Sequence, residues 1–390
     1  MLIFLLILTS LVYGLGFKEA LEKLKERNPE IKALNRMLEA YKGREISAKA
    51  YPNPELRFES GFFSSTEDLK PGGRFIYTLE VSQRLPLWGV RSKRLKLSIL
   101  EKEIFSYEVQ QSINFIISEL YTNFYEALFR KELLKIEEEN LKISKEIKDF
   151  VENAYMMGER TQLELLRARR VLSQAKIQLD LLKNEYEISL KKLSSFIKEK
   201  VEDVEGNLFN VPKTVYINLE ETPRIKGLLS KVRFFEKRID LEKALSKPQP
   251  SVGILMEDSD KGYYGFRVSL SFEMPLMYRR QGEILQNLEL KKATEYSLEA
   301  EKLRLKALLE ATFSKINVLR KSIEHLEKNL IPNAQKELHL GIKSYRLNVI
   351  SLLELSDIKR RYFELLKERA KLYFELHKAY AQLIKIGGLR

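Results

Sequence analysis

The sequence predicts a mainly α-helical chain in which a duplicated unit of long coiled-coil helices carries four β-strands. Three observations lead to this prediction. Three short stretches recur in the same order at nearly one offset, and two segments space their apolar residues alternately by three and four positions. Four further segments alternate apolar and polar residues, which is the period of a β-strand.

The duplication is visible as three pairs of similar stretches. "AKAYPNP" at 48–54 is echoed by "LSKPQP" at 245–250, "RLPLWGVR" at 84–91 by "EMPLMYRR" at 273–280, and "YMMGERTQLELL" at 155–166 by "YRLNVISLLELS" at 345–356. The three offsets are 196, 189 and 190 residues. An ordered set of echoes at one spacing indicates an internal repeat.

We therefore divide the chain into a first repeat at 15–206, a linker at 207–222 and a second repeat at 223–390. Each repeat is expected to contain a helix, a β-hairpin, a long helix and a returning helix. In the first repeat the last three span 52–86, 89–157 and 160–205; in the second they span 248–275, 279–346 and 350–387. Asn28-Pro29 should interrupt the first helix, and Pro332 should bend or locally break the second long helix. The linker is expected to form a small belt of strand or turn.

The returning helices carry the clearest periodicity. A sustained mean spacing of 3.5 residues indicates coiled-coil packing. In the first repeat it covers Leu165, Ala168, Leu172, Ala175, Leu179, Leu182, Tyr186, Ser189 and Leu193; in the second it covers Leu355, Ile358, Tyr362, Leu365, Arg369, Leu372, Leu376, Ala379 and Leu383.

Composition excludes several functions. The chain has no cysteine, which rules out disulfides and thiolate metal sites, and its three histidines lie far apart without ligand spacing. The net charge of +13 is spread along helical faces and mixed with acidic residues, so nucleic acid is not an expected partner. Residues 1–14 are a short apolar run that we interpret as a signal peptide, which predicts export.

The alternating segments resemble transmembrane β-strands, which have one lipid face and one wet face. The residues expected to face lipid are Phe75, Tyr77, Leu79, Val81, Phe266, Val268 and Leu270. The alternative is a pair of soluble hairpins packed on their own helices. Four strands cannot close a barrel alone, and open edges are not tolerated in lipid, so insertion requires an oligomer that pools strands.

The change from strand to helix is expected at "LPLWGVRSKR". Pro86, with its echo Pro275, would end the strand where a missing N–H does least harm, and Gly89 would free the backbone for the turn. Trp88 suits a membrane–water boundary. The basic residues Arg91, Lys93 and Arg94 at a helix start are unfavourable for the helix dipole.

With its two strand pairs, its long helices and "SQRLPLWGVRSKR", the whole mature chain resembles the TolC-type outer-membrane efflux proteins, above all their heavy-metal and multidrug branch. The resemblance implies a homotrimer in which a 12-stranded β-barrel in the outer membrane continues as an α-helical tunnel in the periplasm. It implies a passive, non-enzymatic duct without cofactor or metal. The partners implied are a periplasmic adaptor, an inner-membrane transporter and outer-membrane lipid.

The resemblance also assigns roles to the two helix-reversing turns. The residues that resemble adaptor-contact tips are Gly158, Thr161, Leu163, Asn348, Ser351 and Leu353. Tyr345, Glu354 and Asp357 fall where family members place a tunnel constriction. Ile350 stands where a gate-locking arginine is expected, whereas Arg160 holds the equivalent place in the first repeat.

Two alternatives to an efflux channel stay open from the sequence. The first is an outer-membrane channel for type I protein secretion, and the second is a periplasmic coiled-coil scaffold or adaptor. The sequence does not separate metal ions, drugs and proteins as cargo.

Overall fold

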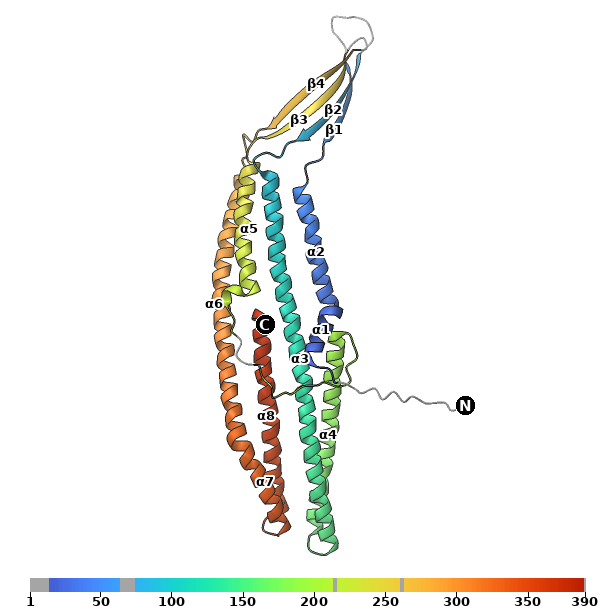
Figure 1. Cartoon of the computed structure of the whole chain (residues 1–390), viewed down its shortest axis with the longest axis vertical. Coiled ribbons are helices and arrows are strands. Elements are labelled where there is room, and N and C mark those ends of the chain that lie inside the picture. Colours follow the sequence, from blue (N-terminus) through green and yellow to red (C-terminus); the bar gives the residue numbers. More distant parts are fainter. Residues whose placement is uncertain (1–13, 64–73, 213–215, 260–262, 389–390) are drawn as a thin grey trace, which may run out of the picture. The chain divides into compact units, whose positions relative to one another are not determined.

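The computed structural model of the chain describes residues 14–63, 74–212, 216–259 and 263–388 (Figure 1). The proposed signal peptide at 1–14 lies outside these residues except for Gly14. Helices dominate, and four antiparallel strands form one sheet. The predicted fold class, mainly helical with four strands, is confirmed.

The first repeat contains four helices and two strands. They are α1 (Phe17–Arg27), α2 (Pro29–Lys49), β1 (Glu55–Phe63), β2 (Arg74–Arg84), α3 (Val90–Met156) and α4 (Gln162–Ile197). The break between α1 and α2 has a local cause, because the Asn28 side chain accepts hydrogen bonds from the backbone N–H groups of Glu30 and Ile31. Helix α3 is unbroken over 67 residues, or about 100 Å.

The second repeat has the same order of elements. They are α5 (Pro223–Leu245), β3 (Gln249–Ser259), β4 (Tyr263–Glu273), α6 (Gln281–His325), the π-helical segment η3 (Leu326–Leu330), α7 (Ile331–Arg346) and α8 (Leu352–Gly387). Pro332 was expected to bend or break this long helix. The structure has a π-helical segment, a wider helical turn, just before the proline. A π-helical turn accommodates a residue that cannot donate the usual backbone hydrogen bond.

One expectation for the region after α4 is wrong, and the described part of the linker takes the second of the two forms expected for it, turns and not strand. The returning helix was expected to reach residue 205, but α4 ends at Ile197 because Lys198 adopts a left-handed conformation with φ of 57°. In the described part of the linker there is no strand; it contains turns and the short 3₁₀ helix η1 (Leu219–Glu221). An isolated parallel bridge joins Leu15 to Val204 just before it.

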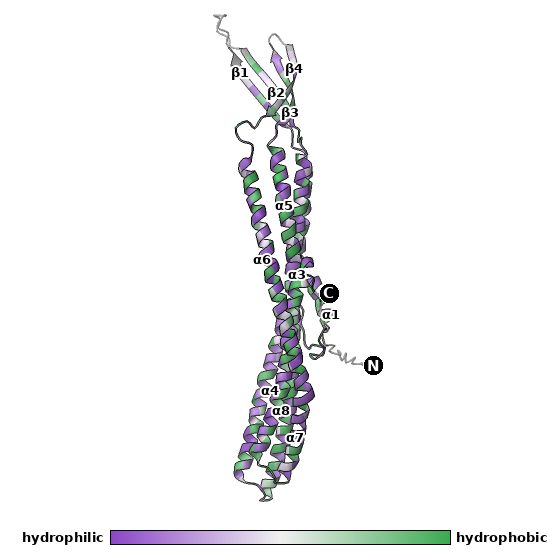
Figure 2. Cartoon of the chain, turned by 90° about the vertical axis from the view of Figure 1, so that its left-hand side faces the viewer, coloured by the Kyte–Doolittle hydropathy of each residue, from purple (hydrophilic) through white to green (hydrophobic). Residues whose placement is uncertain are grey.

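The residues fall into two compact units. The helical unit comprises Met1–Ala33, Gln110–Thr222 and Arg304–Arg390, and the sheet unit comprises Leu34–Val109 and Pro223–Leu303. In the helical unit, α4, α7 and α8 carry hydrophobic and hydrophilic residues along their whole length, as Figure 2 shows. Most of the predicted heptad positions of α4 are buried, among them Leu165, Leu179 and Leu193.

The sheet has the order β1-β2-β3-β4, with every neighbouring pair antiparallel. Residues directly opposite each other in such a ladder share a face. The register pairs Leu79 with Phe58 and Met256, and Ile254 with Val81 and Val268. All residues predicted to face lipid therefore lie on a single face of the sheet. No helix among the described residues is long and apolar enough to cross a membrane.

His377 is buried on α8 against α3 in the helical unit. Its Nδ1 lies 2.8 Å from the Tyr121 hydroxyl, its Nε2 lies 2.9 Å from the Leu208 carbonyl oxygen, and its ring stacks on Tyr125 at 3.6 Å. The neutral ring satisfies both contacts, with Nε2 donating and Nδ1 accepting. Burial lowers the pKa of His377 from 6.5 to about 4, since the charged ring would lose its hydration.

We expect this histidine to make the helical unit sensitive to acid. The unfolded chain binds the proton near pH 6.5 and the folded chain only near pH 4, so stability is complete above about pH 6.5 and falls towards pH 4. The loss is about 3 kcal/mol for this one group. Chemical denaturation of the detergent-solubilised chain between these pH values measures it.

The variant His377→Gln should lose this part of the pH dependence, because glutamine does not titrate. His325→Gln, at an exposed position on α6, is the matched control and should keep it. Equal pH dependence in the unaltered chain and in His377→Gln would contradict the prediction.

Candidate functional site

The two helix-reversing turns have the same backbone geometry. Gly158 has φ of 78° and Asn348 has φ of 60°, so both adopt the left-handed conformation that glycine and asparagine tolerate best. Three residues later in each turn, Thr161 and Ser351 are the N-cap residues of α4 and α8. The equivalence of the two turns is thus present in the backbone as well as in the sequence.

Each returning helix begins with a capping box. The Thr161 hydroxyl accepts a hydrogen bond from the Glu164 N–H at 3.2 Å, and the Ser351 hydroxyl accepts one from the Glu354 N–H at 3.3 Å. The glutamates reach back to the N–H groups of Thr161 and Ser351. Because two otherwise unpaired donors are satisfied at each helix start, both turns are locally stable without external contacts.

Apolar side chains project from both turns. Leu163 is 55% exposed and Leu353 is 66% exposed. Further exposed apolar residues in the same turns are Met156, Met157, Leu347 and Val349. We call this set, with the two leucines, the tip surface. Large apolar groups grouped in this way are typical of an interaction site.

Tyr345 does not line a surface. It is 1% exposed and lies in a core with Val151, Leu165, Leu352 and Leu355, from α3, α4 and α8. Its hydroxyl has no hydrogen-bond partner in the described part of the chain, and burial raises the pKa of this hydroxyl. Tyr345 was expected to line a constriction of the tunnel. In the structure its ring is instead enclosed by side chains of the two turns.

Arg160 joins the two turns. Its guanidinium lies 4.6 Å from the centre of the Tyr345 ring, and its Nη2 donates to the Tyr345 carbonyl oxygen at 2.8 Å. The side chain is only 11% exposed, so both contacts are largely shielded from water. Ile350, the equivalent residue of the second repeat, packs instead against the shared core.

Glu354 and Asp357 are accessible to solvent, but both carboxylates already bind other groups of the chain. Glu354 closes the capping box, and the backbone N–H of Ser351 lowers the pKa of its carboxyl. Asp357 lies between Arg360, at 2.5 Å, and Arg361, at 2.8 Å, and Arg360 lowers the pKa of this carboxyl. The two carboxylates stay ionised without repelling each other strongly, since Asp357 is compensated within its own helix.

The junction between strands and helices has two matching turns. The Leu87 N–H donates to the Leu85 carbonyl around Pro86, and the Leu276 N–H donates to the Met274 carbonyl around Pro275, each at 2.9 Å. Both are three-residue turns centred on proline, a residue whose fixed φ suits this geometry. The Leu85 N–H still donates to the Pro250 carbonyl, so Pro86 follows the last paired position, and Pro275 lies beyond the last residue of β4.

Trp88 and Gly89 turn the chain into α3 through two consecutive left-handed residues, with φ of 57° and 68°. Such a conformation is costly for a bulky residue. Trp88 is held there by a hydrogen bond from its Nε1 to the Pro248 carbonyl at 2.8 Å and by the Lys247 ammonium, 4.9 Å from the ring centre. The indole therefore ties the first junction to the second hairpin.

Two of the three basic residues at the start of α3 have hydrogen-bond acceptors that sequence reasoning missed. Arg91 donates from Nε to the carbonyl of Lys49, the last residue of α2, and its guanidinium lies 4.1 Å from the Tyr51 ring centre. Lys93 donates to the Trp88 carbonyl at 2.9 Å. These side chains satisfy carbonyl groups at the end of one helix and in the turn, which offsets their unfavourable position for the α3 dipole.

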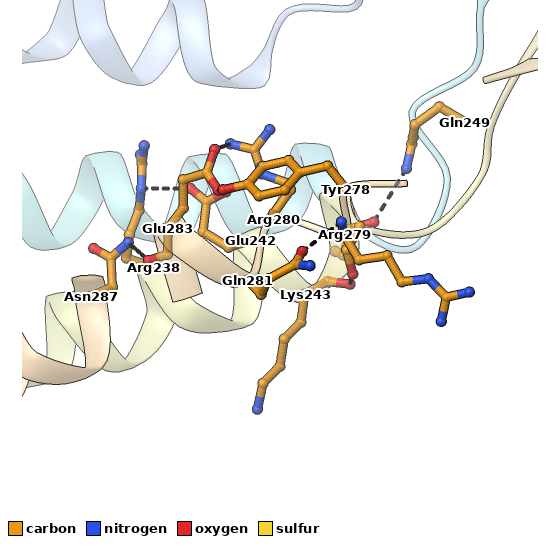
Figure 3. A network of polar contacts seen from close by, with 12 residues as sticks. Arg238, Glu242, Lys243, Gln249, Tyr278, Arg279, Arg280, Gln281, Glu283 and Asn287 are labelled. Carbon is orange, nitrogen blue, oxygen red and sulfur yellow. Dashed lines mark hydrogen bonds and ion pairs between the residues drawn. The ribbon is translucent and has the colours of Figure 1, made fainter. Parts of the chain in front are cut away.

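A second network at the junction was also missed (Figure 3). Glu242 is 1% exposed; one carboxylate oxygen accepts a hydrogen bond from Nε of Arg280 at 2.5 Å, and the other forms an ion pair with Nε of Arg238 at 3.0 Å. Beside it Tyr278 donates to Glu283 at 2.6 Å. A buried carboxylate is stable only with such partners. The signal in the sequence would have been the Arg-x₃-Glu spacing on α5, which is too common to be informative.

The two faces of the sheet differ in chemistry. On the face opposite the apolar one, Arg57 lies 3.6 Å from Glu80, Arg84 lies 3.8 Å from Glu273, and Arg267 pairs with Glu257. Ser269 donates to Glu80 at 2.9 Å. One face is therefore aromatic and aliphatic, and the other carries a chain of ion pairs. No group of three potential metal ligands occurs among the residues that the structure describes.

Comparison with known proteins gives the class. Residues 20–197 match the model of the family described as outer membrane efflux protein. No curated protein matches the chain by sequence. The first repeat thus resembles the outer membrane efflux proteins in sequence, and the resemblance predicted for the chain is confirmed at this level.

Solved structures extend the likeness to nearly the whole chain. The crystal structure of CusC has a TM-score of 0.79 at 15% identity and covers 97% of this chain and 96% of its own. The outer membrane protein VceC from Vibrio cholerae has a TM-score of 0.77 at 12% identity, covering 96% and 97%. The open state of the MtrE channel from Neisseria gonorrhoeae has a TM-score of 0.76 at 15% identity, covering 96% and 89%.

Proposed function

We propose that three copies of this chain form a passive outer-membrane duct of a tripartite efflux system. The observation that carries the proposal is the sheet, which has one apolar face, one face of ion pairs and two outer edges. Among the described residues, β1 pairs only with β2 and β4 only with β3. Edges in lipid must be closed, and three four-stranded sheets would close them in a twelve-stranded barrel.

The dimensions of the strands support this assignment. The strands contain 9 to 11 residues, which is the length of a tilted transmembrane strand. The apolar face, with Val268 78% exposed and Phe266 74% exposed, is suited to lipid. The face with Arg57, Glu80 and Glu257 is suited to a water-filled lumen.

The tip surface is the proposed contact with a periplasmic adaptor, which would connect the duct to an inner-membrane transporter. Its apolar residues lie beside capped helix starts, so they form a fixed and repeated pattern that a helical hairpin of the partner can cover. Photo-crosslinking from Leu353 in native envelopes should capture the adaptor, whereas crosslinking from Ser173 on α4 should not. Capture from both positions or from neither would contradict the assignment.

The gate is proposed to lie at the same turns. Arg160 and Tyr345 hold the α3–α4 turn against the α7–α8 turn, and separating the turns would break one hydrogen bond and one cation–π contact. We infer that the turns switch between this joined arrangement and a separated one. Glu354 and Asp357 would line the passage as solvated carboxylates, and Tyr345 would act from within the core.

We expect the purified chain to be a detergent-soluble trimer that conducts ions in planar bilayers. Val268→Lys should prevent insertion, because a lysine on the lipid face costs about 2–4 kcal/mol near the bilayer centre. Ser271→Lys, on the opposite face of the same strand, is the matched control and should insert. A monomer that stays soluble without detergent, or equal insertion of both variants, would contradict the proposal.

We expect Arg160→Ala to raise the mean conductance of the inserted channel. The substitution removes both contacts to Tyr345, which together stabilise the closed turns by about 1–3 kcal/mol. Arg170→Ala, at an exposed position on α4, should leave the conductance unchanged. Single-channel recording at one salt concentration tests this, and an unchanged conductance of Arg160→Ala would exclude this contact as a latch.

A further inference from the structure

A cleft rich in arginine lies in the sheet unit, next to the ends of the helices that adjoin the strands. Its volume is about 800 Å³, and it is bounded by α2, α3, α5 and the residue before α6. Four arginines and two glutamates line it: Arg44, Arg94, Arg238, Arg280, Glu101 and Glu242. The lining therefore carries an excess of positive charge.

The internal ion pairs leave donors of these arginines unused. Arg238 and Arg280 each bind Glu242 through Nε, so that carboxylate does not occupy their terminal amino groups (Figure 3). One amino group of Arg280 also lies 3.6 Å from Glu283. Arg44 lies 3.5 Å from Glu101, a long contact, and Arg94 makes no ion pair with any residue of the described ranges. Guanidinium groups fixed in this way present forks of N–H donors.

A buried hydroxyl in the same cleft lacks a partner. Ser98 on α3 lines the cleft and is 5% exposed, and its Oγ has no hydrogen bond to any described residue. A buried polar group without a partner costs free energy, so its presence indicates a ligand that completes it. The space is provided by small residues of α2, namely Ala40, Gly43 and Ala48.

We propose that this cleft binds a phosphate group. Phosphate offers several acceptor oxygens to the arginine forks and to the Ser98 hydroxyl, and its charge matches the excess of arginine over glutamate. Two sources share this chemistry, an anionic phospholipid headgroup and free phosphate. The lipid source rests on the proposed function, which would place the ends of the strands at the membrane surface.

The test uses the full chain in uncharged detergent and two ligands, dihexanoyl phosphatidylglycerol and inorganic phosphate, with dihexanoyl phosphatidylcholine as the zwitterionic control. Calorimetry should detect binding of at least one of the first two. Arg94→Gln should weaken that binding about tenfold, the effect of losing one charge-assisted hydrogen bond. Lys96→Gln removes the same charge from an exposed position of α3 outside the cleft and should have no effect.

Ser98→Ala separates a ligand contact from a structural role. It should weaken binding about threefold while leaving the thermal stability of the ligand-free protein unchanged or raised, because it removes an unsatisfied hydroxyl. Tighter binding of phosphatidylglycerol than of phosphate assigns the headgroup, and the reverse assigns free phosphate. Absence of binding by both, or equal affinities in the unaltered chain, Arg94→Gln and Ser98→Ala, would overturn the proposal. Binding is measured without bilayers, so the result is independent of whether the chain conducts.

Discussion

The backbone groups at the outer edges of β1 and β4 set the main constraint on this protein. Among the described residues these edges have no partner, while the central strands β2 and β3 are paired on both sides. In the proposed membrane position lipid would cover the apolar face, and the edge groups could then be satisfied only by another strand. The ion pairs on the opposite face also fit a closed barrel, because they would then face its water-filled interior. The need for further strands, which the proposed trimer would supply, thus comes from hydrogen bonding and not from the helices.

The sequence predicted those features that depend on local geometry. Strand alternation located the faces of the sheet, heptad spacing located buried positions such as Leu165 and Leu193, and glycine or asparagine with a following threonine or serine located the turns. Each of these is decided by a few neighbouring residues. The end of α4 was misplaced by several residues, because Lys198 adopts a left-handed conformation that no local rule requires of a lysine.

Features that depend on distant partners were not predictable. The burial of Tyr345 needs α3, α4 and α8 together, and nothing in its own helix distinguishes it from a surface tyrosine. Arg91 in the basic cluster after Trp88 looked unfavourable because its acceptor, the last carbonyl of α2, lies 42 residues away in sequence. Glu242 likewise depends on Arg280, 38 residues later. Periodicity describes one element at a time, whereas these contacts join several.

The two repeats show which parts of a duplicated fold must stay alike. The turns keep the left-handed residue, the hydroxyl cap and the capping glutamate, because each helix start requires them independently. Tyr155 and Tyr345 occupy equivalent positions, yet Tyr155 is 39% exposed and Tyr345 is buried. A contact between the turns needs one cation and one ring, not two of each. Arg160 supplies the cation, so its counterpart Ile350 is free to pack against the core. The two turns therefore share a backbone geometry but differ in side chains, and the Arg160 side chain of the first turn binds Tyr345 beside the second.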